Sequence, residues 1–290
     1  MSATDECIAK VQALIEQQLQ LLTLSLFICD KGSADFSDEE LVCSLSEQVR
    51  TVVVSMSLAG GQSIGTILQS THKRGIPVRD CFPIARSVVE TLINAAYVLA
   101  GGDSLAEKAI RHTQQRFYRD MDKKVGRGEF QLHISATPPP VVDDQVWLKK
   151  AIEEFTTSRG REKSWTDDSV PMRIEKIGQT LGVIPASGFL GAYALVYADS
   201  SEIIHGSLFG IQLFYRGRAK QPENVEEFRA LTARHLEGIL FALFLALNSY
   251  LRAFCMLQKF TPLDARLKGL FDGFMDAVRG TETMTGRGDR

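Results

Sequence analysis

The chain has 290 residues, enough to bury a large core, and its 44% hydrophobic and 23% charged residues are typical of an ordinary soluble globular protein. Its formal net charge of −2 gives no general electrostatic reason to expect nucleic acid or an anionic membrane as a partner. The five cysteines form no CxxC pair, which argues against a zinc or redox motif and favours a reduced, cytoplasmic compartment. The first residues are acidic and then amphipathic, so we expect no secretory signal.

Helical periodicity runs through nearly every long segment, and no stretch shows sustained strand alternation. We therefore expect an all-α fold: a single large helical-bundle-like domain of about eight to ten helices over residues 1–280. Residues 281–290 have little apolar content and are expected to be a frayed tail.

The first helix is expected over Thr4–Cys29, and a second opens at the capping box Ser37-Asp-Glu-Glu40 and runs towards Gly75. Three glycines in the centre of this second helix, Gly60, Gly61 and Gly65, predict either close helix packing or a kink. A phosphate-binding loop is not favoured there, because no strand precedes the glycines and no Gly-Lys-Ser or Gly-Lys-Thr follows.

The third helix begins near Arg79 and stops at Gly101-Gly102, and a fourth runs from about Ser104 towards Lys124. Residues 126–144 include Pro138-Pro-Pro140 and are expected to be a loop, with 126–142 as a candidate subdomain boundary. Further helices are expected over residues 143–158, 171–181, 187–204, 208–216, 224–259 and 261–279.

The most apolar segment is Leu236–Leu257, but its unbroken apolar run, Ile239–Leu247, is well short of a membrane span. We expect this segment to be a buried central helix, and we expect no membrane association.

The third predicted helix carries an unexpected polar stripe in an apolar stretch. Arg86 and Glu90 are four residues apart, and Asn94 and Tyr97 follow at helical spacing, so all four share one face. Their neighbours predict that this face belongs to the core. Because a buried charge is costly unless it is paired and hydrogen-bonded, these side chains should satisfy one another or serve a site.

A second apolar segment repeats the pattern with Tyr197, Ser201 and His205 at successive i, i+4 positions. We expect the two helices to form a polar pocket for a small anionic or nucleotide-like ligand. Arg86 would bind the anion while Glu90 orients its guanidinium group. His205 is the candidate catalytic acid or base, because imidazole titrates near neutral pH. The predicted ligand-binding residues are Arg86, Glu90, Asn94, Tyr97, Tyr197 and Ser201.

Three interpretations of these residues stay open at this point: a structural cross-link between two core helices, ligand binding, and catalysis. The structural cross-link is the leading interpretation of the three. The sequence does not decide whether the protein is an enzyme.

Glu202-Ile-Ile-His205 has the Glu-x-x-His spacing of di-iron helical bundles, which need a second such motif and two further inward carboxylates. None of the other four histidines has a glutamate three residues before it. We expect no metal and no cofactor.

Three motifs carry a resemblance to a known family: Ala85–Tyr97, Trp165 at a polar helix start, and Tyr197–Ser207. In this order they resemble a mainly bacterial helical family catalogued as a domain of unknown function, number five-six-seven-seven, over about Pro83 to Ser207. The resemblance implies an α-helical protein whose recurring polar positions match Arg86, Glu90, Ser200 or Ser201, and His205. It implies no activity.

A looser resemblance is to the HEPN nucleases, which carry an Arg-x4-6-His motif. Arg229 to His235 and Arg127 to His133 fit this spacing, and His205 does not. The resemblance implies a metal-independent ribonuclease of a toxin or defence system, with RNA as substrate and His205 or His235 assisting attack by a ribose hydroxyl. The third alternative is a non-enzymatic helical interaction protein that forms a homodimer.

Overall fold

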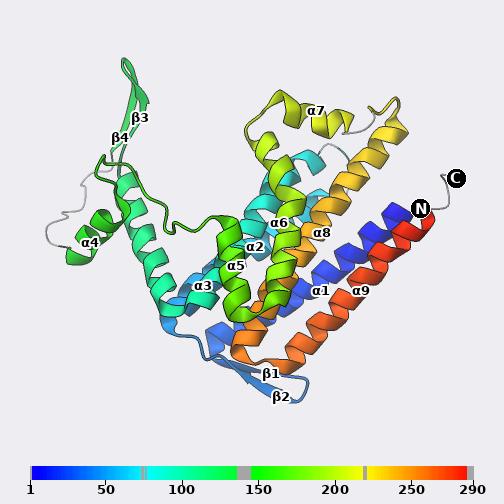
Figure 1. Cartoon of the computed structure of the whole chain (residues 1–290), viewed down its shortest axis with the longest axis horizontal. Coiled ribbons are helices and arrows are strands. Elements are labelled where there is room, and N and C mark those ends of the chain that lie inside the picture. The colour runs from blue at the N-terminus through cyan, green and yellow to red at the C-terminus, as the bar shows by residue number, and fades with distance from the viewer. Residues whose placement is uncertain (1, 73–74, 76, 136–144, 218–220, 286–290) are drawn as a thin grey trace. The chain divides into compact units, whose positions relative to one another are not determined.

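The computed structural model describes residues 2–72, 75, 77–135, 145–217 and 221–285. Within these ranges the chain forms nine helices and two short antiparallel hairpins, so the predicted all-α class is confirmed (Figure 1). The chain divides into two compact units: Met1–Ala100 with Val170–Arg290, and Gly101–Ser169. Residues 126–142, the candidate boundary, lie inside the second unit, and 136–142 are outside the described residues.

The first unit contains most of the helices. It also holds the hairpin of β1 (Ser33–Phe36) and β2 (Glu39–Val42). Its helices are α1 (Ala3–Lys31), α2 (Glu47–Ser70), the start of α3 (Pro77–Asp120), α5 (Val170–Leu181), α6 (Val183–Ile204), α7 (Leu208–Arg216), α8 (Val225–Gln258) and α9 (Thr261–Thr285).

The second unit contains the rest of α3, the hairpin of β3 (Asp122–Arg127) and β4 (Phe130–Ser135), and α4 (Val146–Phe155). The boundary between the units on α3 coincides with a break in the helix at Gly102, which has φ 63° and ψ −149°. This backbone conformation is open to glycine and is strained for residues with a Cβ atom.

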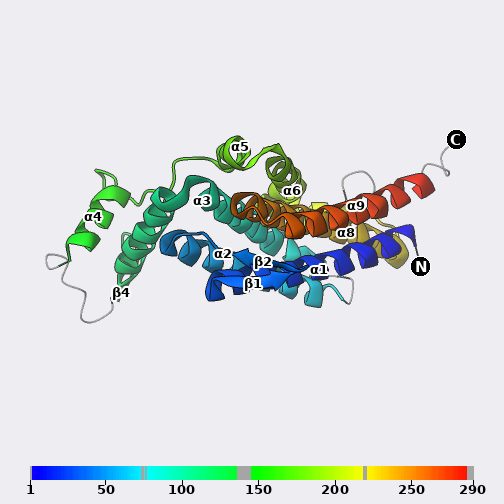
Figure 2. The ribbon, with the colours of Figure 1, turned by 90° about the horizontal axis from the view of Figure 1, so that it is seen from below.

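The central helix of the first unit is α8, as predicted from its apolar sequence. It packs against α1, α6 and α9. Figures 1 and 2 show α1 and α9 running alongside it. Most side chains between Leu236 and Cys255 are buried. Buried amides join the helices: Gln18 Nε2 donates to the Phe244 carbonyl at 3.4 Å, and Asn248 Nδ2 donates to the Leu267 carbonyl at 3.3 Å.

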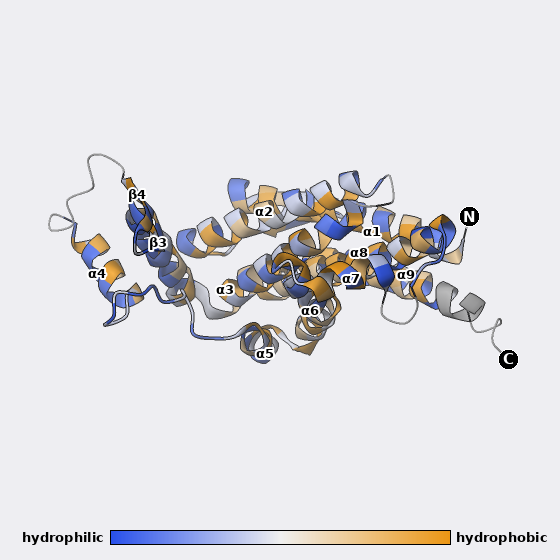
Figure 3. Cartoon of the chain, turned by 90° about the horizontal axis from the view of Figure 1, so that it is seen from above, coloured by the Kyte–Doolittle hydropathy of each residue, from blue (hydrophilic) through white to orange (hydrophobic). Residues whose placement is uncertain are grey.

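Four helices of the described chain, α1, α2, α3 and α8, are long and apolar enough to cross a membrane by length and composition alone. In the most apolar window of α8, 78% of the residues are buried within the protein, compared with 33% in α2. In Figure 3, where the ribbon is coloured by hydropathy, hydrophobic and hydrophilic residues lie interspersed along these helices. Protein packing therefore accounts for most of the apolar sequence of α8.

The predicted helix start at Ser37 is wrong. Ser37 and Asp38 have φ of 51° and 65°, so they form the two-residue turn between β1 and β2. Positive φ at both central positions is the mark of a type I′ hairpin turn. The helix begins instead after Ser46, whose Oγ accepts from the Val49 amide at 3.3 Å.

Two other predicted boundaries also need correction. The expected loop beginning at Gly126 contains β4 and the end of β3, while Pro138–Pro140 lie outside the described residues. At the C-terminus, α9 continues to Thr285, five residues beyond the expected end of the ordered domain at residue 280. The hairpin of β3 and β4 was not predicted, because its strands are short and both of their faces are exposed. Such strands show no alternation of buried and exposed residues.

The glycines of α2 mark close helix packing, one of the two outcomes predicted for them. A Cβ atom on Gly60 would lie 3.1 Å from Leu92 Cδ2 of α3, and one on Gly61 would lie 2.8 Å from Leu22 Cδ2 of α1. Gly65 has no such neighbour within 4 Å. The absence of side chains at Gly60 and Gly61 therefore lets α2 approach both neighbouring helices.

Candidate functional site

The polar stripe of α3 begins with an ion pair. Arg86 Nε donates to Glu90 Oε1 at 2.8 Å, as the i, i+4 spacing predicts. The two side chains are 21% and 32% exposed, so the expectation that they lie in a dry interior is wrong. The pair lies at the edge of the core, where one side of the guanidinium group remains accessible to solvent.

Tyr197 of α6 supplies the second contact of Arg86. The guanidinium carbon lies 4.4 Å from the centroid of the Tyr197 ring, which is within the range of a cation–π interaction. The Tyr193 ring lies beside that of Tyr197, with 4.4 Å between the ring centroids. The structure thus brings together three of the predicted residues, Arg86, Glu90 and Tyr197.

The electrostatics of this group follow from its partial burial. Burial by itself would lower the pKa of Arg86, but the hydrogen bond and charge of Glu90, together with the two tyrosines, raise the pKa above its ordinary value. Burial, its hydrogen bond with Tyr197 and the charge of Glu90 raise the pKa of Tyr193 to about 12. At neutral pH Arg86 is therefore a cation and Tyr193 a neutral phenol.

Asn94 and Tyr97 continue the stripe but do not join the Arg86 contact. Asn94 Oδ1 accepts a hydrogen bond from Arg173 Nη1 of α5 at 2.6 Å. Tyr97 is buried. Eight residues of helix place Asn94 roughly 12 Å along the axis from Arg86. The stripe therefore has one polar contact with α6 and another with α5.

On α6 the buried serine is Ser200 and not Ser201. Ser200 is fully buried, and its Oγ donates to the Phe82 carbonyl of α3 at 2.9 Å. Ser201 is only partly buried. Because consecutive residues of a helix point about 100° apart, Ser200 faces α3 and Ser201 does not share its direction.

His205 lies outside the group formed by Arg86 and Tyr197. It is the exposed C-cap of α6, eight residues and roughly 12 Å of helix beyond Tyr197. No contact joins His205 to Arg86 in the part of the chain that the structure describes. Glu202, three residues earlier, instead accepts a hydrogen bond from Ser207 Oγ at 2.6 Å. Among the described residues, no three His, Cys, Asp or Glu side chains cluster in a way that could hold a metal ion.

Two residues of this region were not predicted from the sequence, Tyr193 and Arg173. Tyr193 is one helical turn before Tyr197, and this repeat of tyrosine at i, i+4 could have revealed it. Arg173 gave no signal, because its relation to Asn94 depends on how α5 packs against α3.

The histidines of the two Arg-x4-6-His matches have other surroundings. The His235 ring stacks on Phe214 with 5.4 Å between centroids and meets Phe82 edge-on at 5.6 Å. His133 lies on the exposed β4 and contacts the Asp122 carboxylate. Each histidine thus has close contacts other than with the arginine of its motif.

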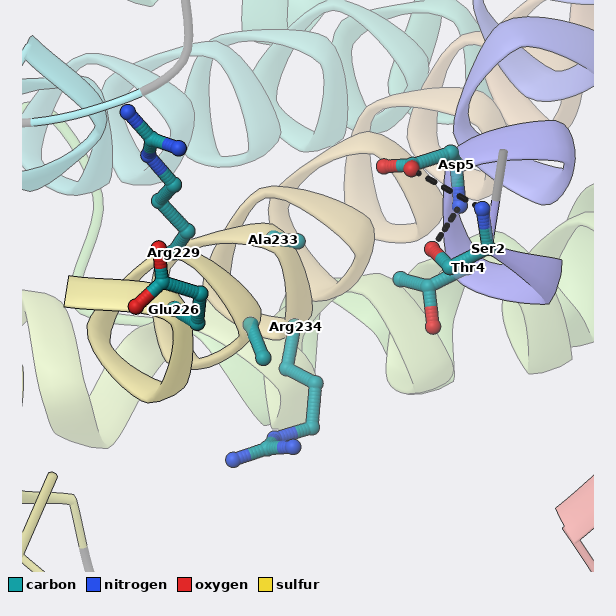
Figure 4. A pocket seen from close by; sticks show the side chains of 8 residues that line it. Ser2, Thr4, Asp5, Glu226, Arg229, Ala233 and Arg234 are labelled. Carbon is teal, nitrogen blue, oxygen red and sulfur yellow. Dashed lines mark hydrogen bonds between the residues drawn. The ribbon is translucent and has the colours of Figure 1, made fainter. Parts of the chain in front are cut away.

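A cavity of about 410 Å³ lies between the first turn of α1 and the first turns of α8 (Figure 4). In Figure 4 the side chains of Arg229 and Arg234 point in opposite directions, so their charges do not converge on one ligand. Ser2 and Asp5 form a reciprocal capping box, with both hydrogen bonds at 3.1 Å. The cavity therefore lacks the convergent polar groups that usually fix a ligand.

Fold and site together define an all-helical protein with an ion pair and two tyrosines where α3 meets α6. Residues 61–221, more than half of the chain, match the family of unknown function DUF5677. The chain belongs to this family. No curated protein and no solved structure matches it.

Proposed function

We propose that this protein is a cytoplasmic bacterial protein that binds a small anionic or nucleotide-like ligand at Arg86. The observation that carries the proposal is the arrangement of the guanidinium group. Its Nε is occupied by Glu90 and its face by Tyr197, whereas its two terminal amino groups make no hydrogen bond to the described residues. The side chain is also partly exposed, so a ligand can reach these amino groups from solvent.

The free edge of the guanidinium group fits an oxyanion. Two parallel N–H groups match the two oxygens of a carboxylate or a phosphate, which makes recognition bidentate and directional. Glu90 and Tyr197 hold the arginine in one orientation, so less side-chain freedom is lost when the anion binds. The half-exposed Tyr197 ring adds a flat surface against which the ring of a nucleotide-like ligand can stack.

The cytoplasmic location is supported by the cysteines. All five are free thiols, and Cys29 and Cys43 remain unbonded with their sulfur atoms 4.0 Å apart. In an oxidising compartment, neighbouring thiols tend to form disulfides. The bacterial origin rests on the mainly bacterial membership of the family that the chain resembles.

The test is a thermal-shift screen of small carboxylates, phosphates and nucleotides on the wild-type protein and on Arg86→Met. A ligand that raises the wild-type Tm should have little effect on Arg86→Met. Arg79→Met is a matched control, because Arg79 lies on the same helix, is 28% exposed and pairs with Asp80 at 3.0 Å. A screen in which no anion separates Arg86→Met from Arg79→Met contradicts the proposal.

A second candidate function, a helical interaction protein that forms a homodimer, is favoured by the outer side of α6. No charged residue occurs between Leu181 and Ala198. Val183, Ile184, Leu190 and Leu195 are nevertheless exposed. A surface without charge can meet its own copy across a two-fold axis without repulsion.

Light scattering after gel filtration distinguishes this second function. If α6 forms the dimer contact, the wild-type protein is a dimer and Leu190→Asp is a monomer. Leu58→Asp, an exposed leucine on α2, is the control that should leave the dimer intact. A monomeric wild-type protein excludes this function.

A further inference from the structure

In the second unit, one face of α3 carries four polar side chains, of which one is buried, two are partly buried and one is exposed. His112, Gln115, Arg116 and Arg119 occupy i, i+3, i+4 and i+7 positions, so they share this face. His112 packs edge-on against Phe155 at the end of α4, with 5.0 Å between the ring centroids. The face is therefore turned towards α4 and the segment that follows it.

The segment after α4 is a tight turn that brings two acceptors to this face. The Thr157 amide donates to the Arg161 carbonyl at 2.7 Å, and the Lys163 amide donates to the Phe155 carbonyl at 2.9 Å. This turn places the Glu162 carboxylate at Arg116 and the Gly160 carbonyl at Arg119.

Both carboxylates that face the set are already paired with arginines. Arg116 Nη1 donates to the two Glu162 oxygens at 2.6 and 2.7 Å. Arg111, one turn earlier, donates to Glu154 with Nε at 2.8 Å and with Nη2 at 3.4 Å. The charge of Arg119 has no carboxylate within ion-pair distance among the described residues, and its Nη2 reaches the Gly160 carbonyl only at 3.5 Å.

Several buried atoms of the same face have no hydrogen-bond partner among the described residues. Gln115 is fully buried, and neither its amide nitrogen nor its amide oxygen is bonded. The same holds for Arg119 Nη1 and for His112 Nε2, which lies 3.5 Å from Glu162 Oε1. Four such atoms on one face would together cost a large part of the stability of a unit of this size. A bound polar molecule would remove that cost.

The free atoms define what this molecule must offer. Arg119 Nη1 and Gln115 Nε2 are donors beside an unmatched positive charge, so they require oxygens that carry negative charge. Gln115 Oε1 is an acceptor and requires a hydroxyl. Burial lowers the pKa of His112, so its ring is neutral at pH 7 and offers one acceptor nitrogen as well.

We propose that Gln115 and Arg119 form a second binding site, separate from Arg86, for a small oxyanion that also carries a hydroxyl group. Phosphate and hydroxycarboxylates share this chemistry. Arg119 and the Gln115 amide nitrogen bind the anionic oxygens, and the Gln115 amide oxygen accepts from the hydroxyl. An anion of the same shape without a hydroxyl would face this oxygen and be repelled.

The test compares two pairs of anions that differ in the hydroxyl group. Inorganic phosphate is matched with sulfate, and glycolate with acetate, at equal ionic strength and pH 7. The expected result is a saturable rise of the wild-type Tm with phosphate or glycolate, at concentrations at least tenfold lower than for its partner anion. Isothermal titration calorimetry on the same solutions should give the same order of affinity.

Variants locate the response. Gln115→Met keeps the length of the side chain and removes its amide, and Arg119→Lys keeps the charge; both should weaken binding by at least tenfold. Arg127→Met, on the exposed β3, is the control that should bind as the wild type does. Arg86→Met should also bind normally here, so failure of the Arg86 site is distinguished from failure of this one.

Two outcomes overturn the proposal. One is an equal response to each anion and its partner, which would show a general salt effect. The other is the absence of a saturable response of the wild-type protein to phosphate and to glycolate. That result would show that the amide is buried without a ligand and is satisfied at most by water. If a variant is unfolded by circular dichroism, the wild-type comparison of the anion pairs decides alone.

Discussion

Arg86 and Tyr197, on two helices far apart in the sequence, meet with the guanidinium carbon 4.4 Å from the ring centroid. Arg86 also donates to Glu90 through Nε, while its terminal amino groups make no hydrogen bond to the described residues. The same residues could instead serve only to join α3 to α6. The unfolding free energy of variants distinguishes a ligand-binding role from a structural one. Removal of a partly exposed ion pair lowers this free energy less than removal of a buried cross-link does.

Glu90→Gln should cost only about 0.5–1 kcal/mol of unfolding free energy, because solvent screens a pair that is about one-third exposed at its carboxylate. Urea unfolding followed by circular dichroism measures this loss. A loss of about 3 kcal/mol or more would indicate a desolvated pair and would favour a purely structural role for Arg86.

The alkaline pH dependence of stability should report Tyr193. Its pKa of about 12 in the folded chain is above the ordinary tyrosine value of about 10 that applies after unfolding. Between these values the unfolded chain binds fewer protons, so the unfolding free energy should fall as pH rises above about 10. Urea unfolding from pH 9 to 11 should show a smaller fall for Tyr193→Phe. An unchanged slope in this variant contradicts the prediction.

Ser200→Ala and Ser201→Ala form a matched pair. Ser200→Ala removes the buried hydrogen bond to the Phe82 carbonyl and should cost about 1 kcal/mol. Ser201→Ala changes a partly exposed side chain and should stay within about 0.5 kcal/mol of the wild type. Equal losses in thermal or urea unfolding would show that the Phe82 contact contributes nothing specific.

Gly210→Ala should destabilise the corner between α6 and α7. A Cβ atom at this position would lie 2.6 Å from the Glu202 carbonyl oxygen and 2.9 Å from the Ile203 amide nitrogen, both backbone atoms. Moving the backbone to relieve such overpacking should cost about 1–3 kcal/mol. Gly238→Ala in α8 is the control. A Cβ atom at this position would have no neighbouring heavy atom within 4 Å, so the change should raise the unfolding free energy by about 0.5–1 kcal/mol. Both values come from urea unfolding, and a Gly210→Ala variant as stable as Gly238→Ala contradicts this account.

Much of the helical architecture could be predicted, because it depends on local periodicity and caps. The predicted start of α8 at Asn224 is its N-cap in the structure, and α7 has the predicted bounds. The contact of Arg86 with Glu90 follows from helix geometry alone. The two polar stripes led us to expect one shared pocket, and the structure brings Tyr197, but not His205, to Arg86.

The remaining features depend on packing that the sequence does not encode locally. Arg173 meets Asn94 only through the arrangement of α5 on α3. Ser200 was not separated from Ser201, because a rotation of about 100° decides which of two adjacent residues faces the core. The capping box at Ser37 was misread, because the same residue types also favour tight turns and local spacing cannot distinguish the two.

The position of α1 between α8 and α9 has a consequence for the order of events during synthesis. The ribosome makes α1 before α8 and α9, yet α8, its main partner, begins at Val225, 194 residues after α1 ends at Lys31. Residues 101–169 form a compact unit from one continuous segment and can fold in the meantime. Because α1 also contacts β1 and α2, which follow it directly, only the part of its surface that packs on α8 and α9 should stay uncovered for most of synthesis. We expect chaperones to bind this part until α8 and α9 emerge.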